Sequence, residues 1–209
     1  MQEVLPPVVQ DMSKKTIGVY RRLSAVNSQI PNCVKFSLQP FPTTKPQPDL
    51  LLTGNITRNG SQINLQYILK GDLTTITIPP PSDTPLRKDG LWTDTCFEFF
   101  LGIPNSPQYW EFNLSSAGHW NVYRFDDYRQ GMQTETACAT LPFHVQQQAD
   151  SLAINLSVDL ATIIPVNQPL EVAITTVIKH KDCEITYWAL THPGTEADFH
   201  RRDSFLVEI

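Results

Sequence analysis

Short runs along the chain alternate between apolar and polar residues with a period of two. In residues 95–101 (TCFEFFL), Phe97 and Phe99 would point to one side of a strand, and Cys96 and Glu98 to the other. Such alternation over four to eight residues predicts β-strands rather than amphipathic helices. Here it also places an ionisable group, Glu98, inside an otherwise apolar strand.

The same pattern recurs along the chain and predicts an all-β protein. Seventeen prolines leave little room for long helices, and we expect only one helical turn, at Asp159–Ile163, capped by Asp159. Asn59-Gly60 is a hairpin turn signal, because both residues tolerate positive φ. About ten strands are predicted, over Cys33–Gln39, Leu50–Thr57, Gln62–Leu69, Thr95–Leu101, Tyr109–Ser115, His119–Phe125, Phe143–Gln148, Leu152–Val158, Leu170–Lys179, Glu184–Trp188 and Ser204–Ile209.

Many short strands without strand–helix alternation indicate an antiparallel β-sandwich or barrel. The length of 209 residues suits one such domain, and 41% hydrophobic residues are enough for its core. We therefore predict an antiparallel sandwich, immunoglobulin-like or jelly-roll-like, over residues 32–209. Residues 1–31 are expected to form an irregular extension, and residues 40–49 a Pro-rich loop.

The charge and the cysteine content indicate which classes of binding partner and which cellular location to expect. The net charge of −5 and the lack of Lys/Arg runs argue against nucleic acid or an anionic membrane as partner. No signal peptide and no transmembrane stretch are predicted. The four cysteines contain no C-x-x-C pair, so we expect free thiols and a cytoplasmic protein: Cys33, Cys96, Cys138 and Cys183.

Polar residues gather in residues 89–129. If the hairpins pair simply, Glu98, Glu111 and Asn113 share one sheet face, with Arg124 nearby. Acceptors, an amide and a guanidinium beside aromatic rings suit a neutral polyol, whose hydroxyls need both donors and acceptors. The alternative is a solvated sheet face on which Glu98 and Arg124 form a modest ion pair.

Long motifs in this region carry a family resemblance. LWTDTCFEFFL, then YWEFNLSSAGHWNVYRFDDYR, resemble the DOMON-like superfamily, and more narrowly its subgroup linked to UDP-N-acetylenolpyruvoylglucosamine reductase. The earlier LQYILKGDL and the C-terminal YWAL-x-HP-x₄-DFHRRDSFLVEI resemble that subgroup too. The resemblance covers roughly residues 33–209 and implies a DOMON-like β-sandwich that binds a ligand.

Family 9 carbohydrate-binding modules share this broader fold and add expectations about residues. They carry a Trp followed six residues later by a Glu, a spacing that Trp92 and Glu98 match. In those modules the Trp stacks on a terminal sugar and a second Trp closes the other side. The resemblance therefore implies a sugar site at Trp92 and Glu98, with Trp188 as the candidate second aromatic. Asn113 and Arg124 are included in this candidate site only because of the predicted strand register.

A loop rich in His, Asp and Arg follows the penultimate strand. His192, Asp198 and His200 could line a pocket there, although a surface loop whose charges satisfy one another is the alternative. None of the five histidines has the spacing of a metal site. We therefore predict no metal ligands and no cofactor.

Three functions remain open. We expect a non-catalytic domain that binds a sugar or similar small polar ligand through Trp92, Glu98, Glu111, Asn113, Arg124, Trp188, His192 and His200. The second alternative is a protein-interaction or scaffold domain. The third is a haem-binding DOMON module, although no His–Met motif supports it. No common catalytic motif occurs, and a Glu98–Glu111 glycosidase pair is the enzymatic alternative.

Overall fold

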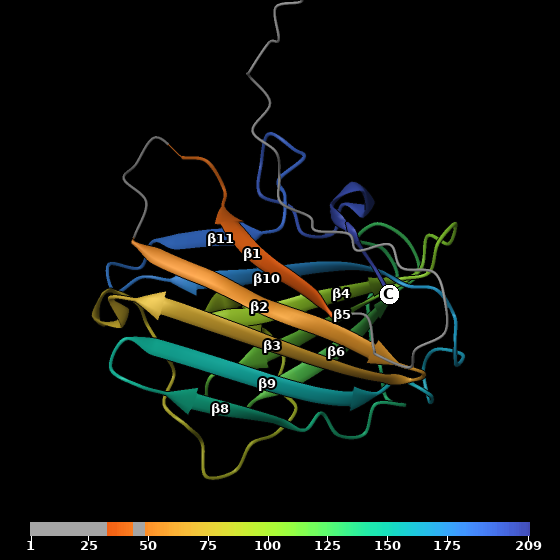
Figure 1. The fold of residues 1–209 in the computed structure, drawn as a ribbon, viewed down its shortest axis with the longest axis horizontal. Coiled ribbons are helices and arrows are strands. Elements are labelled where there is room, and N and C mark those ends of the chain that lie inside the picture. The colour runs from red at the N-terminus through yellow and green to blue at the C-terminus, as the bar shows by residue number, and fades with distance from the viewer. Residues whose placement is uncertain (1–32, 44–48) are drawn as a thin grey trace, which may run out of the picture.

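The protein is described here by a computed structural model that covers residues 33–43 and 49–209. Within these ranges the chain forms one continuous, curled antiparallel sheet that folds into two facing layers (Figure 1). The predicted extension over residues 1–31 and half of the predicted Pro-rich loop, residues 44–48, lie outside the described residues.

The first layer is built from long hairpins. Its strands, in spatial order, are β8 (Phe143–Gln147), β9 (Ser151–Asp159), β3 (Gln62–Gly71), β2 (Leu50–Asn59) and β1 (Val34–Pro40). The β2–β3 hairpin turns at Gly60, whose φ of 60° lies in the left-handed region. Glycine adopts this conformation without a Cβ penalty, so the Asn-Gly turn signal was correct.

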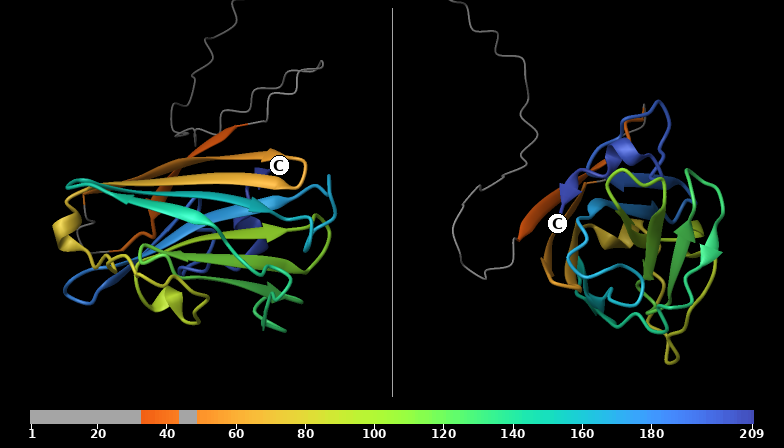
Figure 2. Two further views of the ribbon diagram at one scale, coloured as in Figure 1. Left: turned by 90° about the horizontal axis from the view of Figure 1, so that it is seen from below. Right: turned by 90° about the vertical axis from the view of Figure 1, so that its right-hand side faces the viewer.

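The second layer continues from β1 across seven further strands. Their order is β11 (Ile185–Ala189), β10 (Glu171–Lys179), β4 (Cys96–Gly102), β5 (Tyr109–Ser115), β6 (Trp120–Phe125) and β7 (Gln133–Thr134), with β12 (Val207–Glu208) also paired to β10. Strand β1 belongs to both layers, because Val34–Leu38 pair with β2 and the next two residues pair with β11. Figure 2 shows the resulting curl end-on.

The antiparallel sandwich predicted from the sequence is confirmed. Predicted and observed strand ends differ by one or two residues for most strands, while the last predicted strand shortens to β12, preceded by the 3₁₀ turn η3 (Arg202–Ser204). The two-residue β7 was not predicted. At Asp159 the structure has a hydrogen-bonded turn, in which the carboxylate accepts from the Ala161 N–H.

The main core lies between the two layers. It contains the inward-facing residues of every long strand, among them Leu52, Tyr67, Phe99, Phe112 and Ile174. Phe99 and Phe112 stack with ring centroids 4.4 Å apart, on neighbouring strands at directly paired positions. This core is the reason for the alternation in β4 and β5.

The outer face of the second layer is also covered, which the alternation did not predict. A second apolar cluster lies there, formed by Leu91, Phe100, Tyr109, Phe199 and Phe205 together with neighbouring residues. Leu91 belongs to the 3₁₀ turn η2 (Leu91–Thr93), and the two phenylalanines Phe199 and Phe205 belong to the C-terminal segment. Every residue of β4 and β5 is therefore buried, and a solvated face with a Glu98–Arg124 ion pair is ruled out.

Two simpler expectations can be compared with the described residues. All four cysteines are unpaired, as predicted, with Cys96 and Cys138 buried. No helix in the described ranges has the length and apolar character needed to cross a bilayer.

Candidate functional site

The strand register gathers polar side chains beneath the cover of the second layer. Glu98 on β4 pairs with Asn113 on β5, which pairs with Asn121 on β6. Glu111 lies two residues before Asn113, so its side chain is on the same face. Glu98, Glu111 and Asn113 thus share one face, as the sequence predicted, and this face is the one opposite Phe97 and Phe99.

The two carboxyl groups are buried side by side without a cation between them. Glu98 is 2% exposed, and its Oε1 has no hydrogen-bond partner. Glu111 Oε1 accepts a hydrogen bond of 2.7 Å from the Asn113 amide. Burial raises the pKa of Glu98 well above its usual value, and the neighbouring Glu111 charge raises it further. Burial also raises the pKa of Glu111 to about 7, against the opposing effects of Asn113 and Arg129.

Aromatic and polar groups border this pair on the β6 side. Trp92, from η2, is 39% exposed and packs its ring edge-on against Tyr123, with centroids 5.7 Å apart. The Tyr123 hydroxyl donates to Asp89, and Asn121 donates both to Asp89 and to that hydroxyl. The side of the sheet that carries the two acids therefore also carries one exposed indole.

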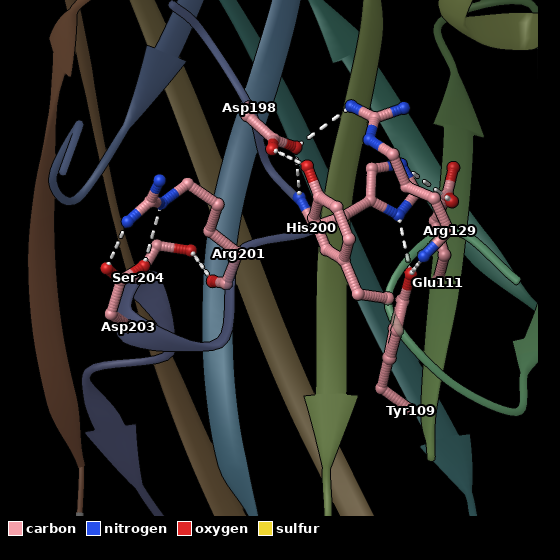
Figure 3. Close-up of polar contacts among 9 residues, drawn as sticks. Tyr109, Glu111, Arg129, Asp198, His200, Arg201, Asp203 and Ser204 are labelled. Atoms are coloured by element: carbon pink, nitrogen blue, oxygen red, sulfur yellow. Dashed lines mark hydrogen bonds and ion pairs between the residues drawn. The ribbon is translucent and has the colours of Figure 1, made fainter. Parts of the chain in front are cut away.

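The C-terminal segment covers Glu111 from the other side (Figure 3). His200 Nδ1 lies 2.8 Å from the Tyr109 hydroxyl, and its Nε2 lies 3.9 Å from Glu111 Oε2. Asp198 fixes the segment, because it accepts from the His200 backbone N–H, from Arg129 and from the Tyr128 hydroxyl. His200 thus lies directly beside Glu111.

The tautomer of His200 follows from these bonds. The backbone N–H of Arg129 donates to the Tyr109 hydroxyl oxygen, and His200 Nδ1 is the acceptor within reach of that hydroxyl's own proton, so we assign Nδ1 as the acceptor. The remaining proton of the neutral ring is on Nε2, which faces Glu111. Burial lowers the pKa of His200 to about 4, so the imidazole is neutral at pH 7.

Removing the Tyr109 hydroxyl should loosen this cover. In Tyr109→Phe the His200 ring nitrogen and the Arg129 backbone N–H both lose their partner, and we expect a loss of about 1–2 kcal/mol in the free energy of unfolding. Urea denaturation measures it. Tyr187→Phe is the matched control, because that ring is partly exposed and its hydroxyl makes no hydrogen bond to another described residue. Equal stability of the two variants would contradict the proposed bonding.

Arg124 does not join the site, and this expectation was wrong. It pairs with Trp110, a residue of the main core, so its side chain leaves the sheet on the face away from Glu98. There it contacts Gln133 at 3.4 Å and Asp126 at 3.9 Å. The length of the β5–β6 turn decides which face of the sheet each β6 residue takes. The observed turn places odd-numbered residues of β5 and β6 opposite each other, so Arg124 lies opposite Trp110.

Trp188 and His192 also lie elsewhere. Trp188 is 3% exposed in the main core, where its indole N–H donates to Thr186. It faces the opposite side of the sheet from Glu98, so it cannot be a second stacking surface. His192 Nε2 lies 2.9 Å from the Gln39 carbonyl and its ring packs against Phe41, where β1 meets β11.

Some residues of the site were missed from the sequence. Asn121 and Tyr123 alternate with the buried Trp120 and Val122, so the same period-two pattern could have placed them on the acid face once the register was known. Asp89 comes from a loop and had no such signal. Among the described residues, no three His, Cys, Asp or Glu side chains gather closely enough to hold a metal ion.

A hollow of about 380 Å³ lies on the outer face of the first layer, away from this cluster. Asn55, Gln66 and Asn155 form a ladder along its floor, each amide bonded to the next at 3.1 and 2.7 Å. These amides are largely satisfied by one another, whereas Glu98 is buried with an unpaired oxygen. We therefore place the candidate site on the second layer.

Comparison with known proteins identifies the fold only. No family model matches the chain, and no curated protein matches it. A crystal structure from Bacteroides uniformis, of a protein proposed to bind carbohydrate, has a TM-score of 0.60 at 13% identity, covering 82% of this chain and 84% of its own. A family 9 carbohydrate-binding module from Caldicellulosiruptor kristjanssonii, in complex with glucose, has a TM-score of 0.48 at 11% identity, covering 78% and 77%.

Proposed function

We propose that this chain binds a sugar without transforming it, on the outer face of the second layer. The observation that carries the proposal is Glu98 Oε1, a buried carboxylate oxygen without a hydrogen-bond partner. An unsatisfied buried acceptor costs about 1–3 kcal/mol. A hydroxyl group of a bound ligand would supply the missing donor.

The surrounding groups suit a ring with several hydroxyls. Glu98 and Glu111 accept hydrogen bonds, the His200 Nε2–H donates, and Asn113 and Asn121 do both. The exposed indole of Trp92 offers an apolar surface for the C–H face of a sugar ring. A small polar contact set of this kind gives affinities in the micromolar to millimolar range.

A ligand can reach Glu98 only if part of the cover moves. The acid is 2% exposed beneath a cluster that includes Leu91 and Phe199, while Trp92 beside it remains open. Association that requires such a movement is slower than a simple encounter. The site thus combines an open aromatic rim with a closed polar floor.

The fold of the Bacteroides protein supports a carbohydrate ligand, because that protein is itself proposed to bind carbohydrate. The motifs around Trp92 and Glu98 also resemble DOMON-like domains and family 9 modules, as described above. We propose that the chain belongs to this group of non-catalytic modules. Incubation with disaccharides should then release no monosaccharide, and release would contradict the non-catalytic assignment.

Replacing Trp92 should weaken sugar binding. We expect Trp92→Ala to raise the dissociation constant about tenfold or more, equivalent to about 1.4 kcal/mol, because the stacking surface is lost. Isothermal titration with mono- and disaccharides measures this without relying on the indole fluorescence that the change removes. Leu51→Ala is the control, since Leu51 is 51% exposed on the first layer.

Two results would count against the proposal. If no sugar binds the wild-type chain, the proposed function fails. If sugars bind equally well to Trp92→Ala and to wild type, the site lies elsewhere. A protein partner captured through Trp92, with no response to any sugar, would favour the interaction-domain alternative.

A further inference from the structure

The candidate site has an excess of buried acid. Glu98 and Glu111 lie on one face with no salt bridge to Lys or Arg among the described residues. Two unpaired carboxylates cannot both stay ionised in a buried cluster without a large desolvation penalty. Either the pair keeps a proton or a positive charge must arrive from outside.

The cations around the pair are already engaged. Arg129 binds Asp198 at 2.9 Å. Arg87 donates to the Asn121 side-chain oxygen and to the carbonyls of Glu135 and Cys138. His200 Nε2 lies 3.9 Å from Glu111 Oε2, but burial lowers the pKa of His200 to about 4, so the ring is neutral at pH 7. No described side chain is therefore placed to neutralise both acids.

We propose that the preferred ligand carries a protonated amine beside its hydroxyls, as an amino sugar does, and that the ammonium pairs with Glu98 and Glu111. This inference rests on the proposed sugar-binding function. An ammonium has three N–H donors. Three acceptors lie on this one face of the sheet: Glu98 Oε1, which has no hydrogen-bond partner, Glu111 Oε2, and the Asn113 side-chain oxygen, which accepts from the weak Cys96 thiol at 3.6 Å.

The same groups favour an ammonium over a metal ion. Hard metal ions need six or more oxygen ligands or a set of at least three strong side-chain ligands, and the described residues hold no such group. Trp92 and Tyr123 lie edge to face at the rim, and the face of an aromatic ring attracts an organic cation. An organic ammonium thus fits both the floor and the rim.

Binding of the ammonium should release a proton. Burial raises the pKa of Glu98 and Glu111 in the free protein, and a bound cation would favour ionisation of both. The other titratable or charged groups around the pair are Cys96 and Tyr67 against Glu98, and Tyr109, Tyr123, Arg129 and His200 near Glu111. The thiol and the phenols stay neutral at pH 7, because burial raises the pKa of each of these groups.

Titration calorimetry of the whole chain at pH 7 with glucose, glucosamine and N-acetylglucosamine tests the inference. Glucosamine is expected to bind about tenfold tighter or more than the other two, which lack a charged amine. In two buffers of different ionisation enthalpy, only glucosamine should show proton release. Glu98→Gln should bring glucosamine to the level of glucose, whereas Asp150→Asn, an exposed acid in the β8–β9 turn, should leave the preference unchanged.

The outcomes separate the two claims. Equal binding of glucose and glucosamine, without proton release, overturns the amine inference and leaves sugar binding intact. Failure of every sugar to bind overturns the proposed function as well. Equally tight binding of ethylammonium, which has no hydroxyls, would overturn the assignment to an amino sugar. Thermal unfolding of each variant establishes that it is folded.

Discussion

Glu111→Gln is expected to stabilise the protein at pH 8 by about 2–3 kcal/mol. The pKa of Glu111 is raised to about 7 in the folded chain, against about 4.5 when unfolded. Below pH 4.5 both states hold the proton. As pH rises toward 7 the unfolded chain releases its proton first, so the contribution of Glu111 to the stability of the wild type falls over this window. Glutamine keeps the acceptor for Asn113 but has no proton to lose.

Denaturant unfolding at several pH values measures this effect. The difference in stability between the variant and the wild type should grow as pH rises from 4.5 to 7, and the variant should equal or slightly trail the wild type at pH 4. Asp150→Asn, at an exposed acid in the β8–β9 turn, is a control for the loss of one negative charge. An unchanged slope in Glu111→Gln would show that Glu111 ionises normally in the folded chain.

His200 contributes to stability in the opposite direction over much of the same pH window. The pKa of His200 is lowered to about 4 by burial. Because the unfolded chain takes up this proton below about pH 6.5 and the folded chain does not, stability falls as pH drops from 6.5 toward 4. This decrease should persist in Glu111→Gln, which separates the contributions of the two groups.

Phe99→Ala is expected to cost about 3–5 kcal/mol in the free energy of unfolding. Phe99 is fully buried, and its ring stacks on Phe112 at 4.4 Å between the two layers. Truncation leaves a cavity that the paired strands cannot close, and also removes an aromatic pair. Chemical denaturation and the melting temperature both report the loss.

Phe99→Leu provides the graded comparison for this position. It keeps much of the buried volume, so its cost should be clearly smaller than that of the alanine variant. Because Phe99 faces away from Glu98, a folded Phe99→Leu should bind sugar like the wild type. A cost below about 1 kcal/mol for Phe99→Ala would contradict the packing described for the main core.

Much of the fold was predictable because period-two alternation depends only on local geometry. Phe97 and Phe99 had to face a core, and Glu98 therefore had to face away from it. The shared face of Glu98, Glu111 and Asn113 followed from simple pairing of one hairpin. His200 was a candidate pocket residue from its loop alone, and only the structure shows that it lies beside Glu111.

The errors arose where the local pattern of residues does not determine how strands pair or which segments cover a face of the sheet. Arg124 was assigned to the wrong face because the parity of β6 depends on the connection before it. Trp188 lies between the exposed Tyr187 and the buried Ala189, and only the position of β11 inside the curled sheet shows that its ring enters the main core. The second apolar cluster joins β4 to a segment about a hundred residues later, a separation that alternation cannot reveal.

Strand β1 has a mechanical consequence for any ligand. Because this single seven-residue strand is hydrogen-bonded to both halves of the curled sheet, the two halves cannot move apart without breaking backbone hydrogen bonds. Space for a ligand must then come from movement of the connecting segments that cover the two acids, around Leu91 and around His200. The sheet would keep Glu98 and Glu111 in place, while the covering segments admit or exclude the ligand.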